Sequence, residues 1–295
     1  MIICIDLGSN TLRACLMNES LEVIKSYEKI VGSARNLSPK GLADDAMERI
    51  KSGLKEIKNE FDFGKFRHKA VATEAFRLAD NAKAFFDDIL VEFGIKFTII
   101  SGQLEARLTK LGVQNRADKL GIDITNALLI DLGGASTEIG FKDEFKSFRF
   151  GIVKFCEECL GEDLSSFKNY DDFENMAIKK TKEAREFISK FKFNTILLTS
   201  GVPTSVAALK LGLTYSSYDA KLVNGLVINE ADMDATIELI KTNPNIDELT
   251  GDSRAGLVLG GIWLLKSMLD SSKPWIVIDD GLREGIAVGA KINLI

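Results

Sequence analysis

One short pattern occurs twice in this chain and constrains its fold more than any other feature. Residues 2–11 read IICIDLGSNT, and residues 128–137 read LLIDLGGAST. Each copy is an apolar strand that ends in aspartate, followed by a turn of small residues and a second strand. A third strand is predicted after each copy, at residues 23–29 and 144–149. Two three-stranded meanders with matching turns predict two related domains.

Helical and strand patterns alternate along the rest of the chain. Helices are predicted at residues 39–61, 81–93, 103–115, 170–191 and 257–269, from Pro203 onward and after Gly281, and strands at 68–73, 95–100, 195–198 and 275–278. The alternation indicates an α/β fold, and 295 residues are too many for one hydrophobic core. We therefore expect one domain made of residues 1–118 and a C-terminal helix at 283–295, and a second domain at 119–282.

The charge and the apolar runs exclude several classes of protein. The chain has 38 basic and 43 acidic residues, a net charge of −5, whereas nucleic-acid binders are usually basic. Its longest apolar stretches, such as residues 95–100 and 257–265, are far shorter than the roughly 18 residues of a membrane span. The first residues start a strand and lack the features of a signal peptide. We expect a cytoplasmic protein that binds neither nucleic acid nor membrane.

The four cysteines do not form a recognisable metal-binding pattern. Cys4 and Cys15 fall in apolar strands and are interpreted as core residues. Cys156 and Cys159 form a single C-x-x-C, and zinc would need a second pair of ligands, whereas the only histidine is His68. Packing within a helix is the favoured interpretation, with redox and metal roles as the alternatives.

The two repeated turns carry the clearest chemistry. Small residues after a strand leave backbone N–H groups and hydroxyls free to surround a phosphate, while the aspartate would repel phosphate and is suited to Mg²⁺ or its waters. The predicted phosphate-binding residues are Gly8, Ser9, Asn10, Thr11, Gly133, Gly134, Ala135, Ser136 and Thr137. The aspartates are Asp6 and Asp131.

Charged residues at other strand ends are further candidates. Arg77 follows a strand and could reach a phosphate with its planar guanidinium. Glu105 lies in the first turn of a predicted helix, where the helix dipole favours a carboxylate. The small-residue turn at 199–205 could meet a nucleotide or a phosphate, or be only a tight connection. Residues 281–285 are similar, and either of their charges could reach a cleft between the two domains.

Together these segments resemble the exopolyphosphatase / guanosine pentaphosphate phosphatase family of the actin-like, sugar-kinase and heat-shock chaperone ATPase superfamily. The matching segments run in order over nearly the whole chain, at residues 5–11, 73–77, 100–108, 130–138, 254–255 and 281–285. The resemblance implies an α/β fold of two actin-like (ribonuclease H-like) domains with an interdomain cleft. We expect Asp6 and Asp131 to approach one another across that cleft.

The resemblance also implies roles for individual residues. Glu105 matches the family's catalytic glutamate, which positions or deprotonates the attacking water, and Arg77 matches an arginine that contacts phosphate. Asp131 matches a magnesium-linked aspartate, and Glu138 matches an acidic residue near the metal; with Asp6 they form the predicted metal site. The expected cofactor is Mg²⁺, with Mn²⁺ as an alternative. The expected substrate is inorganic polyphosphate or pppGpp, which the sequence does not separate, and a homodimer is compatible with the resemblance.

Two positions depart from the family pattern. Leu104 stands where the family usually has glutamate, and Ala135 stands where it has a third glycine. These departures motivate a second hypothesis, a regulatory protein that binds polyphosphate or (p)ppGpp with weak or no hydrolysis. A third hypothesis, an ATP-using kinase of the same superfamily, would need an adenosine motif that residues 199–201 match poorly. Long family members also carry a C-terminal helical domain, so the short, two-domain architecture is expected here.

Overall fold

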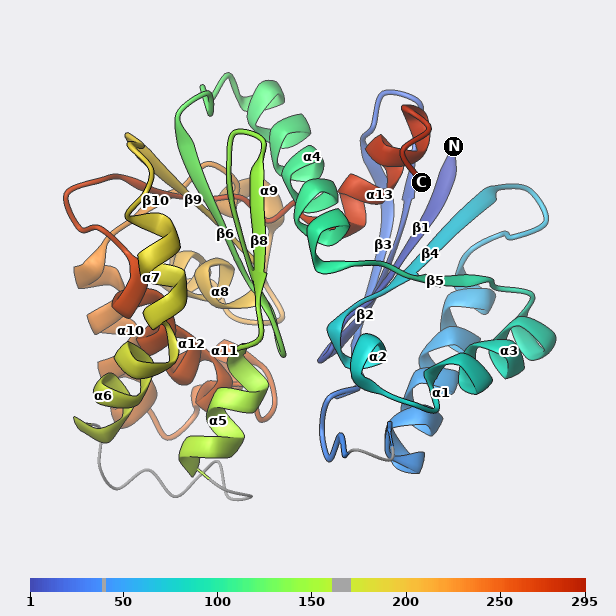
Figure 1. Ribbon diagram of the computed structural model, residues 1–295, viewed down its shortest axis with the longest axis horizontal. Helices are drawn as coiled ribbons and strands as arrows, with labels where there is room; N and C mark the ends of the chain where they lie inside the picture. Colours follow the sequence, from blue (N-terminus) through green and yellow to red (C-terminus); the bar gives the residue numbers. More distant parts are fainter. Residues whose placement is uncertain (39–40, 161–170) are drawn as a thin grey trace. The chain divides into compact units, whose positions relative to one another are not determined.

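The computed structural model describes residues 1–38, 41–160 and 171–295, and the fold is mixed α/β with two sheets (Figure 1). The chain divides into two compact units. The first consists of Met1–Asn115 together with Asp280–Ile295, and the second of Arg116–Asp279. The starts predicted for two helices, at Pro39 and Tyr170, lie outside the described residues.

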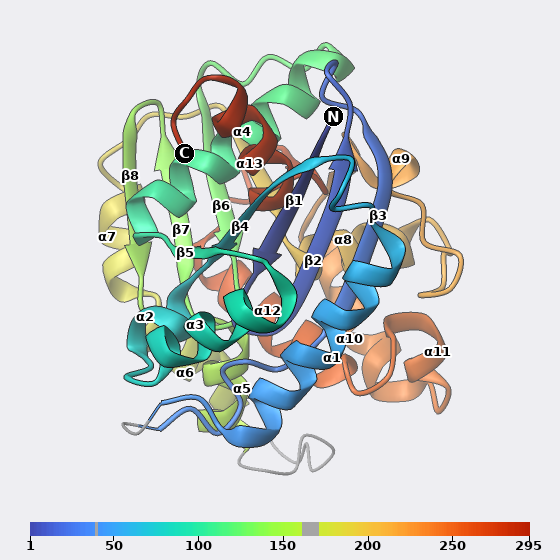
Figure 2. The ribbon, with the colours of Figure 1, turned by 90° about the vertical axis from the view of Figure 1, so that its right-hand side faces the viewer.

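The sheet of the first unit has five strands in the order β3-β2-β1-β4-β5 (Figure 2). The strands are β1 (Ile2–Leu7), β2 (Thr11–Met17), β3 (Val23–Ile30), β4 (Arg67–Ala72) and β5 (Phe97–Ile99). The first three strands form the predicted antiparallel meander, and β4 and β5 extend it in parallel. The meander brings the first repeated turn to the same sheet edge as the ends of the two parallel strands.

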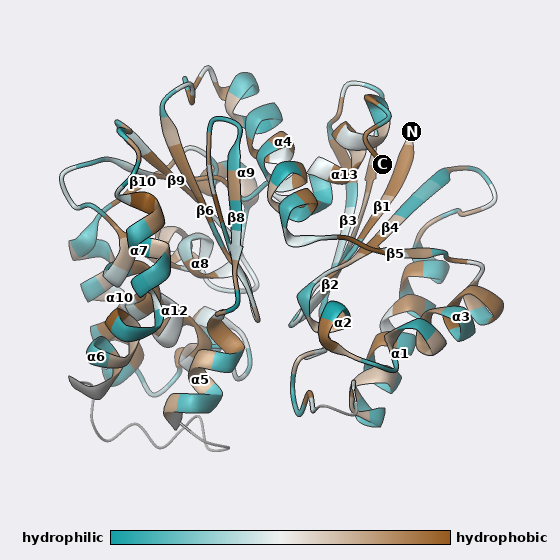
Figure 3. Ribbon diagram, viewed as in Figure 1, coloured by the Kyte–Doolittle hydropathy of each residue, from teal (hydrophilic) through white to brown (hydrophobic). Residues whose placement is uncertain are grey.

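The central strand β1 is buried on both faces. All six of its residues are buried, and its ribbon is brown in Figure 3. The helices of this unit are α1 (Asp44–Glu60), α2 (Glu74–Leu78), α3 (Ala82–Phe93), α4 (Gly102–Leu120), which runs on into the second unit, and α13 (Leu282–Lys291). Ile2 and Cys4 pack with Leu108 of α4 and Ile286 of α13. A Cβ atom on Gly53 of α1 would meet the Leu12 side chain of β2.

The sheet of the second unit has six strands in the order β10-β11-β9-β6-β7-β8. The strands are β6 (Ala127–Leu132), β7 (Thr137–Phe141), β8 (Glu144–Phe148), β9 (Thr195–Thr199), β10 (Val227–Ile228) and β11 (Trp275–Val277). Strands β6, β7 and β8 repeat the antiparallel meander, and β9 pairs with β6 in parallel. The second repeated turn therefore lies beside the end of β9.

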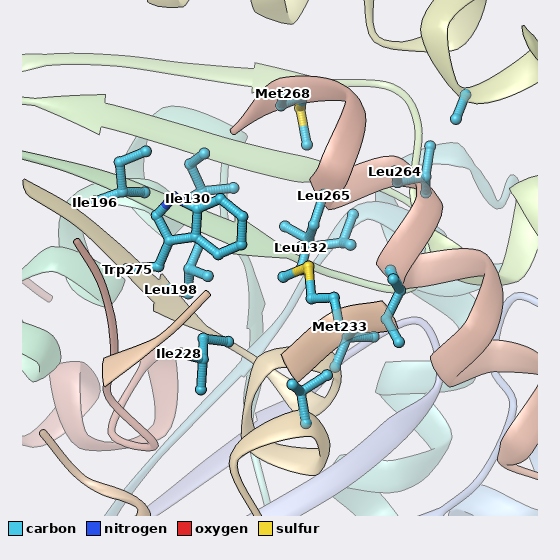
Figure 4. Packing of buried hydrophobic residues seen from close by; sticks show 14 of the residues in the cluster. Ile130, Leu132, Ile196, Leu198, Ile228, Met233, Leu264, Leu265, Met268 and Trp275 are labelled. Atoms are coloured by element: carbon cyan, nitrogen blue, oxygen red, sulfur yellow. The ribbon is translucent and has the colours of Figure 1, made fainter. Parts of the chain in front are cut away.

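Helices pack on this sheet around a large apolar core (Figure 4). They are α5 (Ile152–Leu160), α6 (Asp171–Lys180), α7 (Lys182–Ile188), α8 (Gly201–Lys210), α9 (Ala220–Val223), α10 (Glu230–Thr242), α11 (Ile246–Thr250) and α12 (Ala255–Met268). Trp275 and Met233 in Figure 4 pack with Leu265 of α12. Helix α12 contacts α5, α6, α8 and α10, because it is apolar on nearly every side.

Several predicted helices differ in their bounds from the observed ones; for example, the helix predicted at 103–115 is α4 (Gly102–Leu120). The helix expected at 170–191 is two helices, α6 and α7, separated at Thr181. The Thr181 hydroxyl donates to the Ala177 carbonyl at 2.8 Å and lies 2.8 Å from the Ser267 hydroxyl, and such back-bonding bends helices. Helix α8 begins at Gly201, so Pro203 lies at its third position and not at its first.

The helices between residues 211 and 251 were not predicted, although one has a readable start. The Asn229 side chain accepts from the Asp232 N–H, and the Asp232 carboxylate accepts from the Asn229 N–H, which is a capping box. The Asn-x-x-Asp spacing was the available signal in the sequence.

Over the described ranges, no helix combines the length and the apolar character needed to cross a membrane.

Candidate functional site

The two repeated turns have the same backbone geometry. The Gly8 N–H donates to the Thr11 carbonyl at 2.9 Å, and the Gly133 N–H donates to the Ser136 carbonyl at 3.0 Å. Each turn joins two buried antiparallel strands, so the predicted phosphate-binding residues of each unit do come together in one tight hairpin. Ala135 does not have a positive φ, and an alanine at that position therefore carries no left-handed strain.

Later segments of the chain brace the carbonyl groups of both turns. In the first unit, the N–H groups of Val31 and Gly32 donate to the Asn10 carbonyl at 2.9 and 2.8 Å, and the Ala34 N–H donates to the Ser9 carbonyl at 2.7 Å. These hydrogen bonds satisfy the carbonyl groups of the turn from outside the hairpin and so stabilise its conformation.

The brace in the second unit comes from the start of a helix. The first two residues of α5, Ile152 and Val153, donate their N–H groups to the carbonyls of Gly133 and Gly134 at 2.9 and 2.8 Å. These are two of the N–H groups that a helix start leaves without an internal partner. A Cβ atom on Gly151 would lie 2.5 Å from the Ala135 nitrogen, so only glycine allows this approach.

Hydroxyl groups on the turns differ in what they can offer a phosphate. Ser9 and Ser136 lie within the turns and are buried, with exposed fractions of 6% and 4%. Thr137 is fully buried and donates its hydroxyl to the Phe150 carbonyl at 2.8 Å. The Thr137 proton therefore braces the second hairpin and is not directed to a ligand.

Asp6 of the first hairpin lies in a row of alternating charge. The strand register places Arg13 of β2 directly opposite Asp6, and Glu28 of β3 directly opposite Arg13. Arg13 donates from Nε to Glu28 Oε2 at 3.0 Å. Residues directly opposite on antiparallel strands have neighbouring side chains, so the Asp6 carboxylate lies beside a cation.

The corresponding row of the second hairpin is acidic. Here Glu138 of β7 lies directly opposite Asp131, and Ser147 of β8 lies opposite Glu138. The Ser147 hydroxyl donates to Glu138 Oε1 at 2.6 Å. Like charges directly opposite on a sheet are destabilising, and a divalent cation would remove that penalty.

The donor set of the second hairpin fits Mg²⁺. No cluster of three or more His, Cys, Asp or Glu residues suited to a metal occurs in the described part of the chain. Mg²⁺ does not need one, because it keeps several waters and binds one or two carboxylates together with substrate phosphates. Asp131 and Glu138 are such a pair, whereas Asp6 is adjacent to Arg13.

Arg77 and Glu105 are joined in an ion pair, as the sequence could not show. Arg77 donates from Nη1 to Glu105 Oε2 at 2.8 Å and to the Ile100 carbonyl at 2.7 Å. It also donates from Nε to Glu74 Oε2 at 2.7 Å. Glu74, a residue that sequence reasoning did not select, is thus a member of the same cluster.

This cluster lies at the carboxyl edge of the first sheet. Strands β1, β4 and β5 are parallel neighbours. The Thr73 N–H, just before α2, donates to the Leu7 carbonyl, and the Ile100 N–H donates to the Ala72 carbonyl. The turn after β1, Arg77 after β4 and Glu105 after β5 are therefore carried by three adjacent strand ends, the usual place for ligands in open α/β sheets.

The guanidinium of Arg77 stays charged despite its burial. Burial lowers the pKa of Arg77, but the carboxylates of Glu105 and Glu74 raise it, and the resulting pKa is above its ordinary value. The site thus presents one permanent cation shared by two carboxylates.

The fold accommodates both departures from the family pattern. Leu104 packs partly buried against the core formed by β1, α4 and α13. Ala135 is buried, with 1% exposure, in a turn without positive φ.

The turn at 199–205 places Ser200 at a φ of 95° immediately before α8, with its carbonyl accepting from the Thr204 hydroxyl at 2.9 Å. Ser200 is thus a strained residue in a tight connection.

The C-x-x-C cysteines lie on α5 as packing residues. Cys156 is buried with its thiol 3.5 Å from the Gly256 carbonyl, and the Cys159 thiol is 3.6 Å from the Met176 sulfur. Burial raises the pKa of Cys156 to about 12 and that of Cys159 to about 11. Both thiols are protonated at neutral pH, which disfavours metal binding and thiolate chemistry.

Comparison with known proteins gives one consistent family. Residues 17–292 match the model of the Ppx/GppA phosphatase family. A bifunctional 3-dehydroquinate synthase/phosphatase of Fusobacterium nucleatum is 26% identical to this chain, in a match that covers 97% of the chain. A guanosine-5'-triphosphate,3'-diphosphate pyrophosphatase of Pseudoalteromonas translucida is 31% identical, in a match that covers 70% of the chain. The chain spans 46% and 42% of the length of these two relatives.

A solved structure matches over the full length. The Aquifex aeolicus member of the Ppx/GppA family is 27% identical, with a TM-score of 0.77, and the match covers 99% of this chain and 98% of the Aquifex chain. This agreement confirms the predicted α/β fold with two actin-like domains. The approach of Asp6 to Asp131 stays a prediction, as do the roles assigned to individual residues.

Proposed function

Because this chain belongs to the Ppx/GppA phosphatase family, we propose that it is a phosphohydrolase that releases the terminal phosphate of inorganic polyphosphate or of pppGpp. Both molecules present a terminal phosphoanhydride. The observation that carries the proposal is the ion pair of Glu105 with Arg77 at the sheet edge that also bears the Gly8–Thr11 turn. This edge combines a base, a cation and a phosphate-binding turn.

Glu105 is the proposed general base. Glu105 is buried and lies in the first turn of α4, where the helix dipole favours the charged form of its carboxylate. As water attacks the terminal phosphorus, the bond to the bridging oxygen breaks and the water proton passes to the Glu105 carboxylate. The Arg77 contact orients that carboxylate and restricts its motion.

The remaining groups hold the substrate. The N–H groups and serine hydroxyls of the two turns are suited to phosphate oxygens. Asp131 and Glu138 would hold Mg²⁺ together with its waters. When bound, Mg²⁺ supplies positive charge to the phosphate oxygens of the substrate.

A binding protein without turnover is the second hypothesis, and it was motivated by Leu104 and Ala135. Leu104 completes a hydrophobic core, and Ala135 adopts the turn conformation without strain. Neither position removes Glu105 or Arg77. Hydrolysis therefore remains the function that these residues favour.

The test is phosphate release from polyphosphate, pppGpp and ATP in parallel assays, with Mg²⁺, with Mn²⁺ and with EDTA. We expect release from polyphosphate or pppGpp that needs a divalent cation. Release from ATP alone would favour the kinase-like hypothesis. Tight binding of polyphosphate or pppGpp without release would favour the regulatory hypothesis.

A further inference from the structure

Arg77 uses most of its hydrogen-bonding capacity within the protein. Its Nε donates to Glu74 Oε2, and its Nη2 is 2.6 Å from the same oxygen. Its Nη1 is shared between Glu105 and the Ile100 carbonyl. A guanidinium has five N–H groups; Nε and Nη1 donate to three protein oxygens, whereas Nη2 makes no hydrogen bond to the described residues despite its closeness to Glu74. An arginine that served only to bind phosphate would be expected to direct its fork outward.

Glu74 contacts the Arg77 guanidinium at Nε and Nη2, whereas Glu105 contacts it at Nη1. The side chain of Glu74 is 7% exposed and that of Arg77 is 18% exposed. Glu74 and Arg77 are three residues apart on the short helix α2, so their side chains lie on one face. Glu105 approaches the same guanidinium from α4 and is 9% exposed.

The charge of Glu74 is difficult to explain by substrate binding. A carboxylate repels a polyanionic ligand, so Glu74 does not help Arg77 to attract phosphate. A buried carboxylate at this position therefore needs another role. Arginine has a long side chain with many rotamers, and a second anchor reduces the freedom of its fork.

We propose that Glu74 is a positioning residue: it holds the Arg77 guanidinium in the orientation that aligns Glu105 for attack by water. This inference rests on the proposed function of Glu105 and adds a residue to it. Small misplacements of a catalytic group can cost about 100-fold in rate. The loss of Glu74 should therefore appear in kcat, whereas KM should change little.

The kinetic test compares Glu74→Ala and Glu74→Gln with the wild-type protein. We expect Glu74→Ala to lower kcat by about 10- to 100-fold with KM within about threefold. Glutamine keeps an oxygen that can accept from Arg77 Nε, so Glu74→Gln should recover a large part of the loss. The matched control is Glu238→Ala, which removes an exposed acidic partner three residues before Lys241 on α10 and should leave kcat unchanged.

A double variant separates positioning from a general loss of structure. If Glu74 acts through Glu105, Glu74→Ala should lower kcat further by less than about twofold in a Glu105→Gln background. An equal loss in both backgrounds would contradict the proposal, and so would an effect confined to KM.

A crystal structure of Glu74→Ala tests the geometry without any assay. We expect the Arg77 guanidinium to leave its contact with Glu105. A guanidinium still 2.8 Å from Glu105 in that structure would overturn the inference. Because this readout does not need turnover, failure of the inference and failure of the proposed hydrolysis can be told apart. If Glu74→Ala does not fold, Glu74→Met, which has a similar length but no carboxylate, is used for the same measurements, with displacement of the guanidinium or loss of kcat still required.

Discussion

The two hairpins of this protein share a backbone and differ in charge. Both have the same strand register and the same glycine-to-carbonyl hydrogen bond across the turn. Across from its aspartate, however, the first hairpin has Arg13 and the second has Glu138. A duplicated scaffold thus presents a cation at one copy and a carboxylate pair at the other. We therefore propose that Mg²⁺ binding belongs to the second hairpin.

Removal of the proposed base should have the largest effect. Glu105→Gln is nearly isosteric and loses the charge that accepts the water proton. We expect turnover to fall by about 10²–10⁴-fold, the usual contribution of a general base, while substrate binding and thermal unfolding stay close to wild type. Turnover, binding and unfolding are measured on the same preparation. Near-normal turnover would place the base elsewhere and weaken the assignment of catalysis to the first unit.

Arg77→Ala should affect both steps, but turnover less severely. Loss of a charge-assisted hydrogen bond costs about 1.5–3 kcal/mol, or about 10- to 100-fold. Because Arg77 contacts Glu105 and is the partly buried cation of the cluster, we expect lower turnover together with weaker substrate binding. Isothermal titration with pppGpp gives the affinity, and Arg77→Lys serves as the charge-preserving control. Unchanged affinity would restrict Arg77 to a positioning role.

The two aspartates offer a direct test of the comparison. Asp131→Asn removes one of two facing carboxylates, so we expect the Mg²⁺ concentration for half-maximal activity to rise by about tenfold or more. Asp6→Asn should change it by less than about threefold, because Asp6 lies opposite Arg13. The same contrast should appear without substrate, as a rise of the melting temperature with Mg²⁺ in wild type and Asp6→Asn but not in Asp131→Asn. A greater Mg²⁺ requirement in Asp6→Asn than in Asp131→Asn would reverse the assignment.

The smallest expected effect concerns the bracing of the turns. A Cβ atom on Gly151 would lie 2.5–2.6 Å from backbone atoms of the second turn, whereas one on Gly8 would lie 3.4 Å from the Thr11 oxygen. Gly151→Ala should therefore lower the free energy of unfolding by about 1–3 kcal/mol, as overpacking usually does. Gly8→Ala should stay within about 1 kcal/mol. Denaturant titration of both variants measures the difference. Equal losses of unfolding free energy would show that the close approach of Gly151 to the second turn does not distinguish the two turns.

The sequence predicted those features that depend on local order. The repeated turns, the strands that flank them and the alternation of helices and strands were all readable, because period and small-residue turns are local signals. The opposite charges at Arg13 and Glu138 were also readable, since each lies seven residues after its aspartate. They could have been found by aligning the two copies beyond the turn.

Contacts between distant segments could not be predicted in this way. The Glu74–Arg77–Glu105 cluster joins α2 to α4 only because β4 and β5 are neighbours in the sheet. The amides of α5 reach Gly133 and Gly134 only after the third strand of the meander has turned back. Tertiary context, and not local propensity, sets these contacts.

The return of α13 to the first unit has a consequence for protein synthesis. Ile2 and Cys4 of β1 are covered by Leu282 and Ile286, which leave the ribosome after the whole second unit. The second unit is one continuous segment and can fold first, whereas β1 must wait with an apolar face uncovered. A nascent chain that ends at residue 279 and is stalled behind a linker long enough to fill the ribosomal exit tunnel should accordingly resist protease in the second unit and remain sensitive in the first. In the cell, that waiting period is when a chaperone would have most to bind.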